Sequence, residues 1–310
     1  MLSPSDLFTI PFDDWVNTLV RDFLVPNLRP VFRAMQVPVT AVLDSLEAFF
    51  RFVPMLVTTA AFALVAWYTV GRGLALFTIL ALVFIDLIGL WPETMTTLSM
   101  IITSVLFCTI IGIPIGILAA GSNRLWAVTR PVLDIMQTIP SFVYLVPIVM
   151  LFGVGMVPGI IATIVFALPP IIRLTNLGIR NVRADLIEAA EAFGSTRWQM
   201  LWEVQFPLAL RTIMAGLNQT LMLSLSMVVI AALIGAGGLG LTVYTGLGRL
   251  NVGGATAGGV GIVLLAIILD RITQALGEQN GVRTPSLRQT LASFFRPRAS
   301  VAGEAGNTGS

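Results

Sequence analysis

Residues 212–248 read TIMAGLNQTLMLSLSMVVIAALIGAGGLGLTVYTGLG and contain no Asp, Glu, Lys, Arg or His. A helix needs ~20 predominantly apolar residues to cross the hydrocarbon core of a bilayer, so this stretch is long enough to span it. Residues 135–172 and 250–269 are uncharged as well. Three such stretches in one chain predict an integral membrane protein built from helices.

The overall composition supports the same class. Hydrophobic residues make up 56% of the chain and charged residues only 11%, against roughly 25% charged in a typical soluble domain. There is no histidine and the only cysteine is Cys108, which excludes a Cys/His metal site and a disulfide within the chain. The net charge of +2 comes from arginines placed between apolar segments, which indicates topology signals rather than a nucleic-acid surface.

The fold class expected is an all-α polytopic membrane protein with about seven spans. Gly, Pro and charged residues separate them, and their approximate ranges are 54–71, 74–91, 97–120, 132–152, 156–178, 208–234 and 252–270. Three parts follow from this division. They are an amphipathic segment over 1–52, a transmembrane domain over 53–271 that includes the loop 184–207, and a mostly mobile tail over 272–310.

Arginines set the orientation of this predicted bundle. If seven spans alternate, one side carries Arg72, Arg124, Arg130, Arg173, Arg180, Arg183, Arg197, Arg211 and the arginines from Arg271 onward. The short loops of the other side hold only Arg249, so the arginine-rich side is expected to be cytoplasmic. This places the N-terminus outside and the C-terminus inside.

The segment 1–52 has the pattern of an amphipathic helix. Between residues 39 and 53 apolar side chains repeat at helical spacing opposite Asp44, Glu47 and Arg51. Two interpretations stand: the helix lies along the membrane surface, or its apolar stripe packs against the other helices. The first 30 residues lack the basic start and apolar core of a cleaved signal peptide, so the segment is expected to stay on the protein.

The longest loop predicted on the cytoplasmic side, RADLIEAAEAFGSTRWQMLWEVQFP over residues 183–207, carries strong local signals. Asp185 with Glu188, and Thr196 with Gln199, have the spacing of two capping boxes. Gly194 suits the left-handed residue that ends a helix. The loop is therefore predicted to form two short helices joined at a glycine.

The same loop offers a surface for a partner. Pro207 suits the first turn of the following span, and Ala189, Ala190 and Ala192 give the first short helix a small, apolar face. Such a face fits the mode of recognition in which a helix lies in a groove on another protein.

The loop also resembles the EAA motif of binding-protein-dependent ABC importer permeases. The positions that carry the resemblance are Glu188, Ala189, Ala190, Gly194, Val204, Phe206 and Pro207. The family pattern has Ile and Leu where Val204 and Phe206 stand, and the spacing is intact. The resemblance implies a type I ABC importer permease fold in which this loop docks on a cytoplasmic ATP-binding subunit.

A narrower resemblance covers residues 95 to 277. The stretches LDIMQTIPSFVYLVPIVMLFG, VFALPPIIRLTNLGI and IMAGLNQTLMLSLSMVVIAALIGAGGLG look like permeases for glycine betaine, proline betaine and related quaternary amines. The resemblance implies import of such a compatible solute across the cytoplasmic membrane of a bacterium, in the service of osmoprotection. Which amine is carried, whether proline is accepted, and how osmotic strength regulates transport stay open at this point.

The partners follow from what the chain lacks. It has no G-x-x-x-x-G-K-[ST] phosphate loop, so the chain is expected to be neither an enzyme nor its own motor, and ATP is expected on a separate subunit, with no cofactor on this chain. The resemblance further implies an extracytoplasmic solute-binding protein. One coupling loop per chain implies a homodimer that engages two ATPase subunits in the lipid bilayer.

Uncharged polar and aromatic residues inside the spans are candidates for the solute pathway. They are Gln137, Ser141, Phe142 and Tyr144 in the fourth span, and Asn218 and Gln219 in the sixth. A betaine carries a quaternary ammonium, which favours aromatic faces, and a carboxylate, which accepts hydrogen bonds. Phe142 and Tyr144 could serve the ammonium and Gln137 or Asn218 the carboxylate. The alternative is that these residues only hold helices together.

Three acidic residues lie in or beside the predicted spans. Asp134 is expected to pair with Arg130 one turn earlier, and Asp270 with the adjacent Arg271. For Asp86 an outward-reaching side chain, a pair with a neighbouring helix and a place in a vestibule all stand open.

Two rival functions are weaker. An ion-coupled secondary carrier usually places carboxylates or broken helices near the midplane, where only Asp86 is a candidate, and it leaves the EAA-like loop unexplained. An intramembrane enzyme would have to work without histidine and with one cysteine inside an apolar run.

Overall fold

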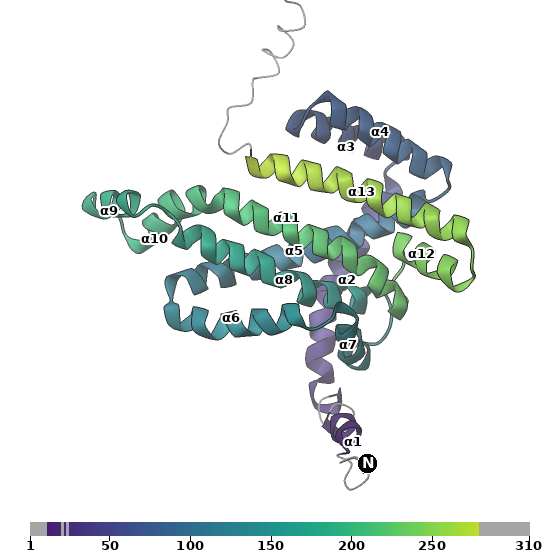
Figure 1. Cartoon of the computed structure of the whole chain (residues 1–310), viewed down its shortest axis with the longest axis horizontal. Coiled ribbons are helices and arrows are strands. Elements are labelled where there is room, and N and C mark those ends of the chain that lie inside the picture. Colours follow the sequence, from purple (N-terminus) through teal and green to yellow (C-terminus); the bar gives the residue numbers. More distant parts are fainter. Residues whose placement is uncertain (1–10, 20–21, 23–24, 279–310) are drawn as a thin grey trace, which may run out of the picture.

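A computed structural model describes residues 11–19, 22 and 25–278, and the regular structure of these residues is entirely helical (Figure 1). In chain order the elements are α1 (Phe12–Asn17), α2 (Val25–Phe52), α3 (Met55–Thr69), α4 (Arg72–Leu87), α5 (Trp91–Gly121), α6 (Asn123–Thr138), η3 (Ser141–Tyr144), α7 (Leu145–Phe152), α8 (Met156–Arg180), α9 (Ala184–Ala192), α10 (Arg197–Gln199), η4 (Met200–Gln205), α11 (Phe206–Ala231), η5 (Ala232–Ile234), α12 (Leu239–Gly248) and α13 (Val252–Glu278). The prediction of an all-α membrane fold is confirmed.

The number of spans is not confirmed as seven. Among the described residues four helices are long and apolar enough to cross a membrane: Trp91–Gly121, Met156–Arg180, Arg197–Ile234 and Val252–Gly277. The count rises to six if each of two sharply bent helix pairs forms one span. The helices α3 and α4 occupy the first two predicted spans, but with 15 and 16 residues they fall short of the ~20 that a straight crossing needs.

The predicted span over 132–152 is broken near its middle. Helix α6 ends at Thr138, and the chain bends by 105° before η3 and α7. Ile139 precedes Pro140 and has the extended backbone, ψ 127°, that a following proline favours. The hydroxyl of Tyr144 donates a hydrogen bond to the carbonyl of Met136, which ties the two sides of the bend together.

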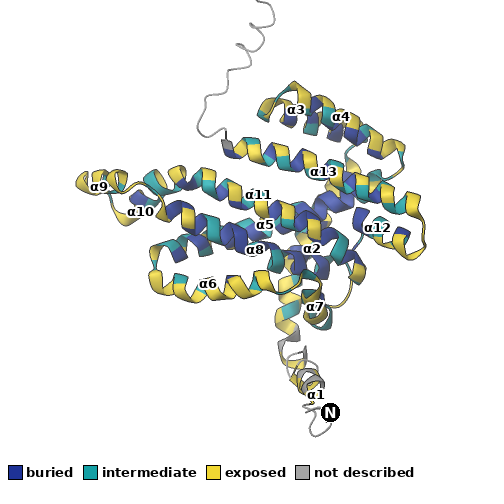
Figure 2. Cartoon of the chain, viewed as in Figure 1, coloured by how far each residue is buried: buried dark blue, intermediate teal, exposed yellow. Residues whose placement is uncertain are grey.

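The centre of the molecule is α8, which packs against α11 on one side and α5 on the other. Glycines allow these close approaches. A Cβ atom added to Gly116 of α5 would lie 2.5 Å from Cβ of Thr175 on α8, and one added to Gly216 of α11 would lie 3.0 Å from Cβ of Leu174 on α8. Figure 2 shows that these three helices hold much of the buried surface.

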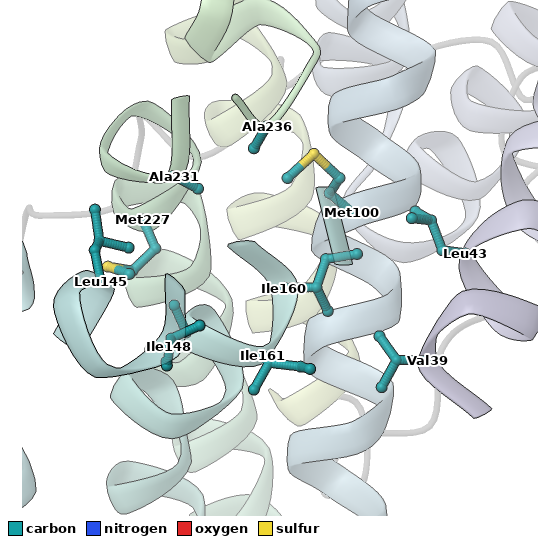
Figure 3. Packing of buried hydrophobic residues seen from close by; sticks show 11 residues of the cluster. Val39, Leu43, Met100, Leu145, Ile148, Ile160, Ile161, Met227, Ala231 and Ala236 are labelled. Atoms are coloured by element: carbon teal, nitrogen blue, oxygen red, sulfur yellow. The ribbon is translucent and has the colours of Figure 1, made fainter. Parts of the chain in front are cut away.

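Helix α2 crosses the direction of α8 and α11 in Figure 1, and its apolar stripe packs on the bundle. Val39 and Leu43 are buried in a cluster with Met100 of α5 and Ile160 of α8 (Figure 3). Of the two interpretations of this segment, the one in which the stripe contacts the other helices is therefore the one observed. Residues 1–10 of the predicted segment lie outside the described part of the chain.

The C-terminal helix α13 extends beyond the predicted end of the transmembrane domain. It continues to Glu278, and Ile272 is buried against α3 and α4. The first residues of the predicted tail, 272–278, are therefore part of α13, and the prediction that the tail is mostly mobile stays a prediction. Residues 279–310 of that tail lie outside the described residues.

Candidate functional site

The loop between α8 and α11 stands clear of the bundle at one end of the molecule (Figure 1). It forms the two short helices predicted, α9 and α10, joined at a glycine. Helix α9 has no buried residue, so Glu188 and Ala189 are exposed and Ala190 is half-buried. Figure 2 shows that most of the surface of α9 is exposed.

The turn that joins the two helices depends on the backbone of Gly194. Its φ is +81°, in the left-handed region that favours glycine. The Gly194 N–H donates to the carbonyl of Glu191 at 2.9 Å, and the Ser195 N–H donates to the carbonyl of Ala190 at 3.1 Å, which caps the last turn of α9. A Cβ atom at Gly194 would meet nothing within 4 Å, so conformation rather than space requires glycine here.

One predicted capping box forms and the other does not. The Thr196 hydroxyl accepts from the Gln199 N–H at 3.3 Å and the Gln199 side chain accepts from the Thr196 N–H at 2.9 Å, as predicted. The prediction of a capping box between Asp185 and Glu188 was wrong. Helix α9 begins at Ala184, so Asp185 lies inside its first turn and instead accepts two hydrogen bonds from Arg183, at 2.5 and 3.1 Å.

The loop returns to the bundle without leaving helical geometry. The π-helical segment η4 connects α10 to α11, and the chain is helical from Arg197 to Ile234. Pro207 occupies the first turn of α11, as predicted. Since π-helical turns are rare and frequently occur at functional sites, η4 marks the place where the loop is joined to a span.

Two aromatic features of this loop escaped the sequence reasoning. Phe193, at the tip of α9, is 92% exposed. Trp198, Trp202 and Phe206 contact one another in succession, edge-to-face at a centroid distance of 5.4 Å for the first pair and tilted at 5.1 Å for the second. Their spacing of four residues is visible in the sequence and is the signal that could have identified them.

The pathway candidates of the fourth predicted span gather at the break between α6 and α7. Gln137 and Phe142 are exposed, with Phe142 at 60%, and Ser141 is half-buried. Tyr144 differs from them, because its ring lies against Phe166 of α8 with a centroid distance of 6.3 Å and its hydroxyl is hydrogen-bonded to Met136. Phe142 and Gln137 thus keep free surfaces, while Tyr144 also has a packing role.

The two candidates of the sixth predicted span lie in different surroundings. Gln219 is exposed on α11. Asn218 lies between α11 and α13, where its Nδ2 donates to Asp270 at 3.0 Å and its Oδ1 accepts from the Thr273 hydroxyl at 2.6 Å. Its amide is therefore already engaged on both sides. The pathway roles of Gln219 and Asn218 both stay predictions, and of the two only Gln219 is exposed.

Two predicted ion pairs were wrong. Asp134 pairs with Arg173 of α8 at 2.5 Å rather than with Arg130. Asp270 accepts both Nε2 hydrogen bonds of Gln274 at 2.8 Å, and no ion pair to Arg271 is found among the described residues. Adjacent residues on a helix point in different directions, whereas residues four apart share a face, which explains the second outcome.

Asp86 is exposed near the end of α4. Its backbone carbonyl accepts from the Gly89 N–H at 2.8 Å, and the chain turns there towards α5. The three interpretations of Asp86 stay predictions.

Comparisons with known proteins agree with this geometry. Over most of its length the chain is similar to two curated permease proteins. The glycine betaine/proline betaine transport system permease protein ProW of Escherichia coli (strain K12) is 54% identical over 283 residues, which cover 91% of this chain and 80% of that protein. The glycine betaine transport system permease protein OpuAB of Bacillus subtilis (strain 168) is 45% identical over 265 residues, which cover 86% and 94% of the two chains.

A solved structure and a family model complete the comparison. The inward-facing MetNI methionine ABC transporter, in its CY5 native crystal form, matches 61% of this chain and 93% of its own with a TM-score of 0.53 and 26% identity. The family model described as binding-protein-dependent transport system inner membrane component matches residues 112–279, which include the loop with Gly194 and the helices α8 and α11. The chain belongs to this family of inner membrane components of binding-protein-dependent transport systems.

Proposed function

We propose that this chain is the permease subunit of an ATP-driven importer for glycine betaine or a related quaternary amine. The similarity to permease proteins named for glycine betaine and proline betaine transport supports the class of solute. The uncharged polar and aromatic surface around Gln137 and Phe142 suits a zwitterion that carries no net charge.

The observation that carries the proposal is the exposed helix α9 at the tip of the molecule. Its outer surface includes Glu188, Ala189 and the nearly fully exposed Phe193. An unpartnered amphipathic helix of this kind fits a groove on a second protein. Because α9 follows α8 directly and α10 continues through η4 into α11, closure of two ATPase subunits around α9 would move both central helices.

The assembly we propose has two copies of this chain. Each copy presents one coupling helix to one cytoplasmic ATPase subunit, which binds and hydrolyses the ATP. A separate receptor delivers the solute at the opposite end of the bundle, which faces outside. The arginines at the coupling end, among them Arg180 and Arg183, support this orientation through the excess of positive charge on cytoplasmic loops.

At the coupling end, hydrogen bonds from Arg180 connect α8 to α5 and α6. The Arg180 guanidinium donates to the Ala119 carbonyl of α5 at 2.9 Å and to Oδ1 of Asn123 on α6 at 2.7 Å. This contact makes the end of α8 next to α9 part of one body with α5 and α6. The proposed coupling motion therefore reaches the break at Pro140 through α6 as well as through α11.

Reconstitution tests the proposal. The permease, its ATPase and its receptor are placed in proteoliposomes with ATP on the side of the membrane that holds the ATPase. Radiolabelled glycine betaine, choline or proline is added on the receptor side, and its uptake is followed. We expect ATP-dependent import of glycine betaine. Import of none of the three solutes by a complex that hydrolyses ATP would contradict the quaternary-amine assignment, and import without the ATPase would contradict the ATP-driven mechanism.

A further inference from the structure

A cavity of about 440 Å³ lies at the end of the bundle opposite the coupling loop. Its walls come from α2, the first turns of α5 and α8, the Gly237–Gly238 turn and α12; the lining residues that matter here are Glu47, Arg51, Glu93, Thr96, Met156 and Thr242. This volume falls within the ~300–1,000 Å³ of small-molecule sites. No residue of the cavity was among the candidates that the sequence suggested.

The wall formed by α2 carries a fixed pair of opposite charges. Arg51 Nη2 lies 2.6 Å from Glu47 Oε1, and the Thr96 hydroxyl of α5 donates to the same oxygen at 3.0 Å. Glu47 is thereby held by two donors. The Arg51 side chain is 60% exposed and its guanidinium has five N–H groups, so it can still donate to an anion in the cavity.

The wall formed by α5 carries a second carboxylate, Glu93, which lacks the donors that Glu47 has. Glu93 Oε2 is buried, and within the described residues it has no hydrogen-bond partner. A buried carboxylate oxygen without a donor is costly, because folding removes its water without replacing it. The cavity lining holds two carboxylates and one guanidinium, so its net charge favours a cation near Glu93.

A quaternary ammonium in the cavity has the charge that Glu93 needs. Since Oε2 itself is inaccessible, the cation acts on the carboxylate through the electric field across the cavity and not by direct contact with this oxygen. It carries a positive charge but no N–H, so it neutralises a carboxylate without needing hydrogen-bond geometry. Its methyl groups need apolar neighbours, which Pro92, Met156 and Leu241 supply in the same cavity. A carboxylate on the same small molecule would meet the free N–H groups of Arg51.

We propose that this cavity is a transient binding site for a zwitterionic betaine, with the trimethylammonium group against Glu93 and the carboxylate against Arg51. The inference rests on the proposed function, since it assumes that a betaine reaches this end of the permease. Binding here is weak, because a site on a transport path that holds its solute tightly releases it slowly. The cavity thus receives the solute before it enters the bundle.

Direct binding tests the site. The permease with its ATPase is placed in lipid nanodiscs without receptor, and equilibrium binding is measured by saturation-transfer NMR for three probes of similar shape. Glycine betaine has both charges, choline has only the cation, and 3,3-dimethylbutanoate replaces the ammonium nitrogen by carbon. We expect glycine betaine to bind at least tenfold more tightly than 3,3-dimethylbutanoate.

Two variants and a matched control locate the binding. Glu93→Gln is expected to weaken glycine betaine binding at least tenfold. Arg51→Gln, which changes an exposed side chain and so leaves the fold intact, is expected to remove the preference for glycine betaine over choline. Asp86→Asn deletes an exposed carboxylate elsewhere on the same molecule and is expected to leave all three affinities unchanged.

Two outcomes overturn the inference. One is a wild-type permease that binds no glycine betaine while the complete complex imports it, and the other is Glu93→Gln and Arg51→Gln proteins that bind and import like the wild type. In both cases the proposed function stands and only the site is wrong. Failure of the complete complex to import any of the three solutes of the reconstitution assay overturns the proposed function, and the site with it.

Discussion

The α5–α8 interface and the α9–α10 turn both depend on a glycine, for opposite physical reasons. Gly116 of α5 is helical, and a Cβ atom there would lie 2.5 Å from the Thr175 side chain and 2.9 Å from the Ile172 carbonyl oxygen. Gly194 has open space around it but a φ of +81°. The first glycine is required by what surrounds it, and the second by the backbone it adopts.

This difference separates the scaffold from the coupling element. Around Gly116 the helices α5 and α8 pack closely, within a cluster of buried apolar residues. Around Gly194 there is open space, the turn is held by its own hydrogen bonds and by the packing of α9 on η4, and α9 has no buried residue. The loop is therefore shaped mainly by local conformation, while the bundle is shaped by its own packing.

The largest effect is expected from Gly116→Leu. The added side chain would overlap the backbone of α8, and overpacking of this kind costs about 1–3 kcal/mol or more. We expect loss of monodisperse protein on size exclusion in detergent. Gly121→Leu on the same helix is the matched control, since a Cβ atom there meets nothing within 4 Å, and its melting temperature is expected to stay near wild type. Equal behaviour of the two variants would remove the packing explanation.

The second effect concerns the turn. Gly194→Val should leave the bundle folded but disfavour the left-handed residue by about 1–3 kcal/mol, which lowers the population of the native turn by roughly 5- to 150-fold. Receptor- and solute-stimulated ATP hydrolysis of the reconstituted complex is expected to fall by the same factor. Gly194→Asn should keep most of the stimulation, because asparagine tolerates this conformation. Full stimulation by the Val variant would show that the turn does not carry coupling.

A smaller effect is expected from Asn218→Ala, which tests whether this residue belongs to the scaffold. The change removes the hydrogen bonds that join α11 to Asp270 and Thr273 of α13, worth about 1 kcal/mol in a membrane bundle. We expect a lower melting temperature with normal uptake per folded complex. Unchanged stability together with lost uptake would instead place Asn218 on the solute pathway.

The smallest effect is expected from Asp134→Asn. The side chains of Arg173 and Asp134 are 34% and 51% exposed, and ion pairs of this exposure contribute about 0–1 kcal/mol. Unfolding of the wild type and the variant should converge at 1 M salt, because the interaction is screened there. A loss well above 1 kcal/mol would mean that this pair belongs to the packed scaffold rather than to its surface.

Several features of the coupling loop followed from the sequence because they are local. The glycine turn and the Thr196–Gln199 capping box involve residues within a few positions of each other, so the residue types alone predict the geometry. The capping box at Asp185 failed for an equally local reason. Arg183, two residues earlier, offered the carboxylate a charged donor.

The sequence by itself determined that this is a helical membrane protein with a loop of two short helices joined at a glycine, since uncharged runs and capping residues act over one helix or one turn. Only the tertiary structure decided which polar groups meet. Asp134 pairs with Arg173, Asn218 with Asp270, and Glu47 with Thr96, and each contact joins residues 39 to 52 positions apart on different helices. The periodicity of a sequence shows which face of a helix is polar. Which neighbouring helix that face contacts depends on how the helices pack, and close contacts such as the one at Gly116 fix that packing.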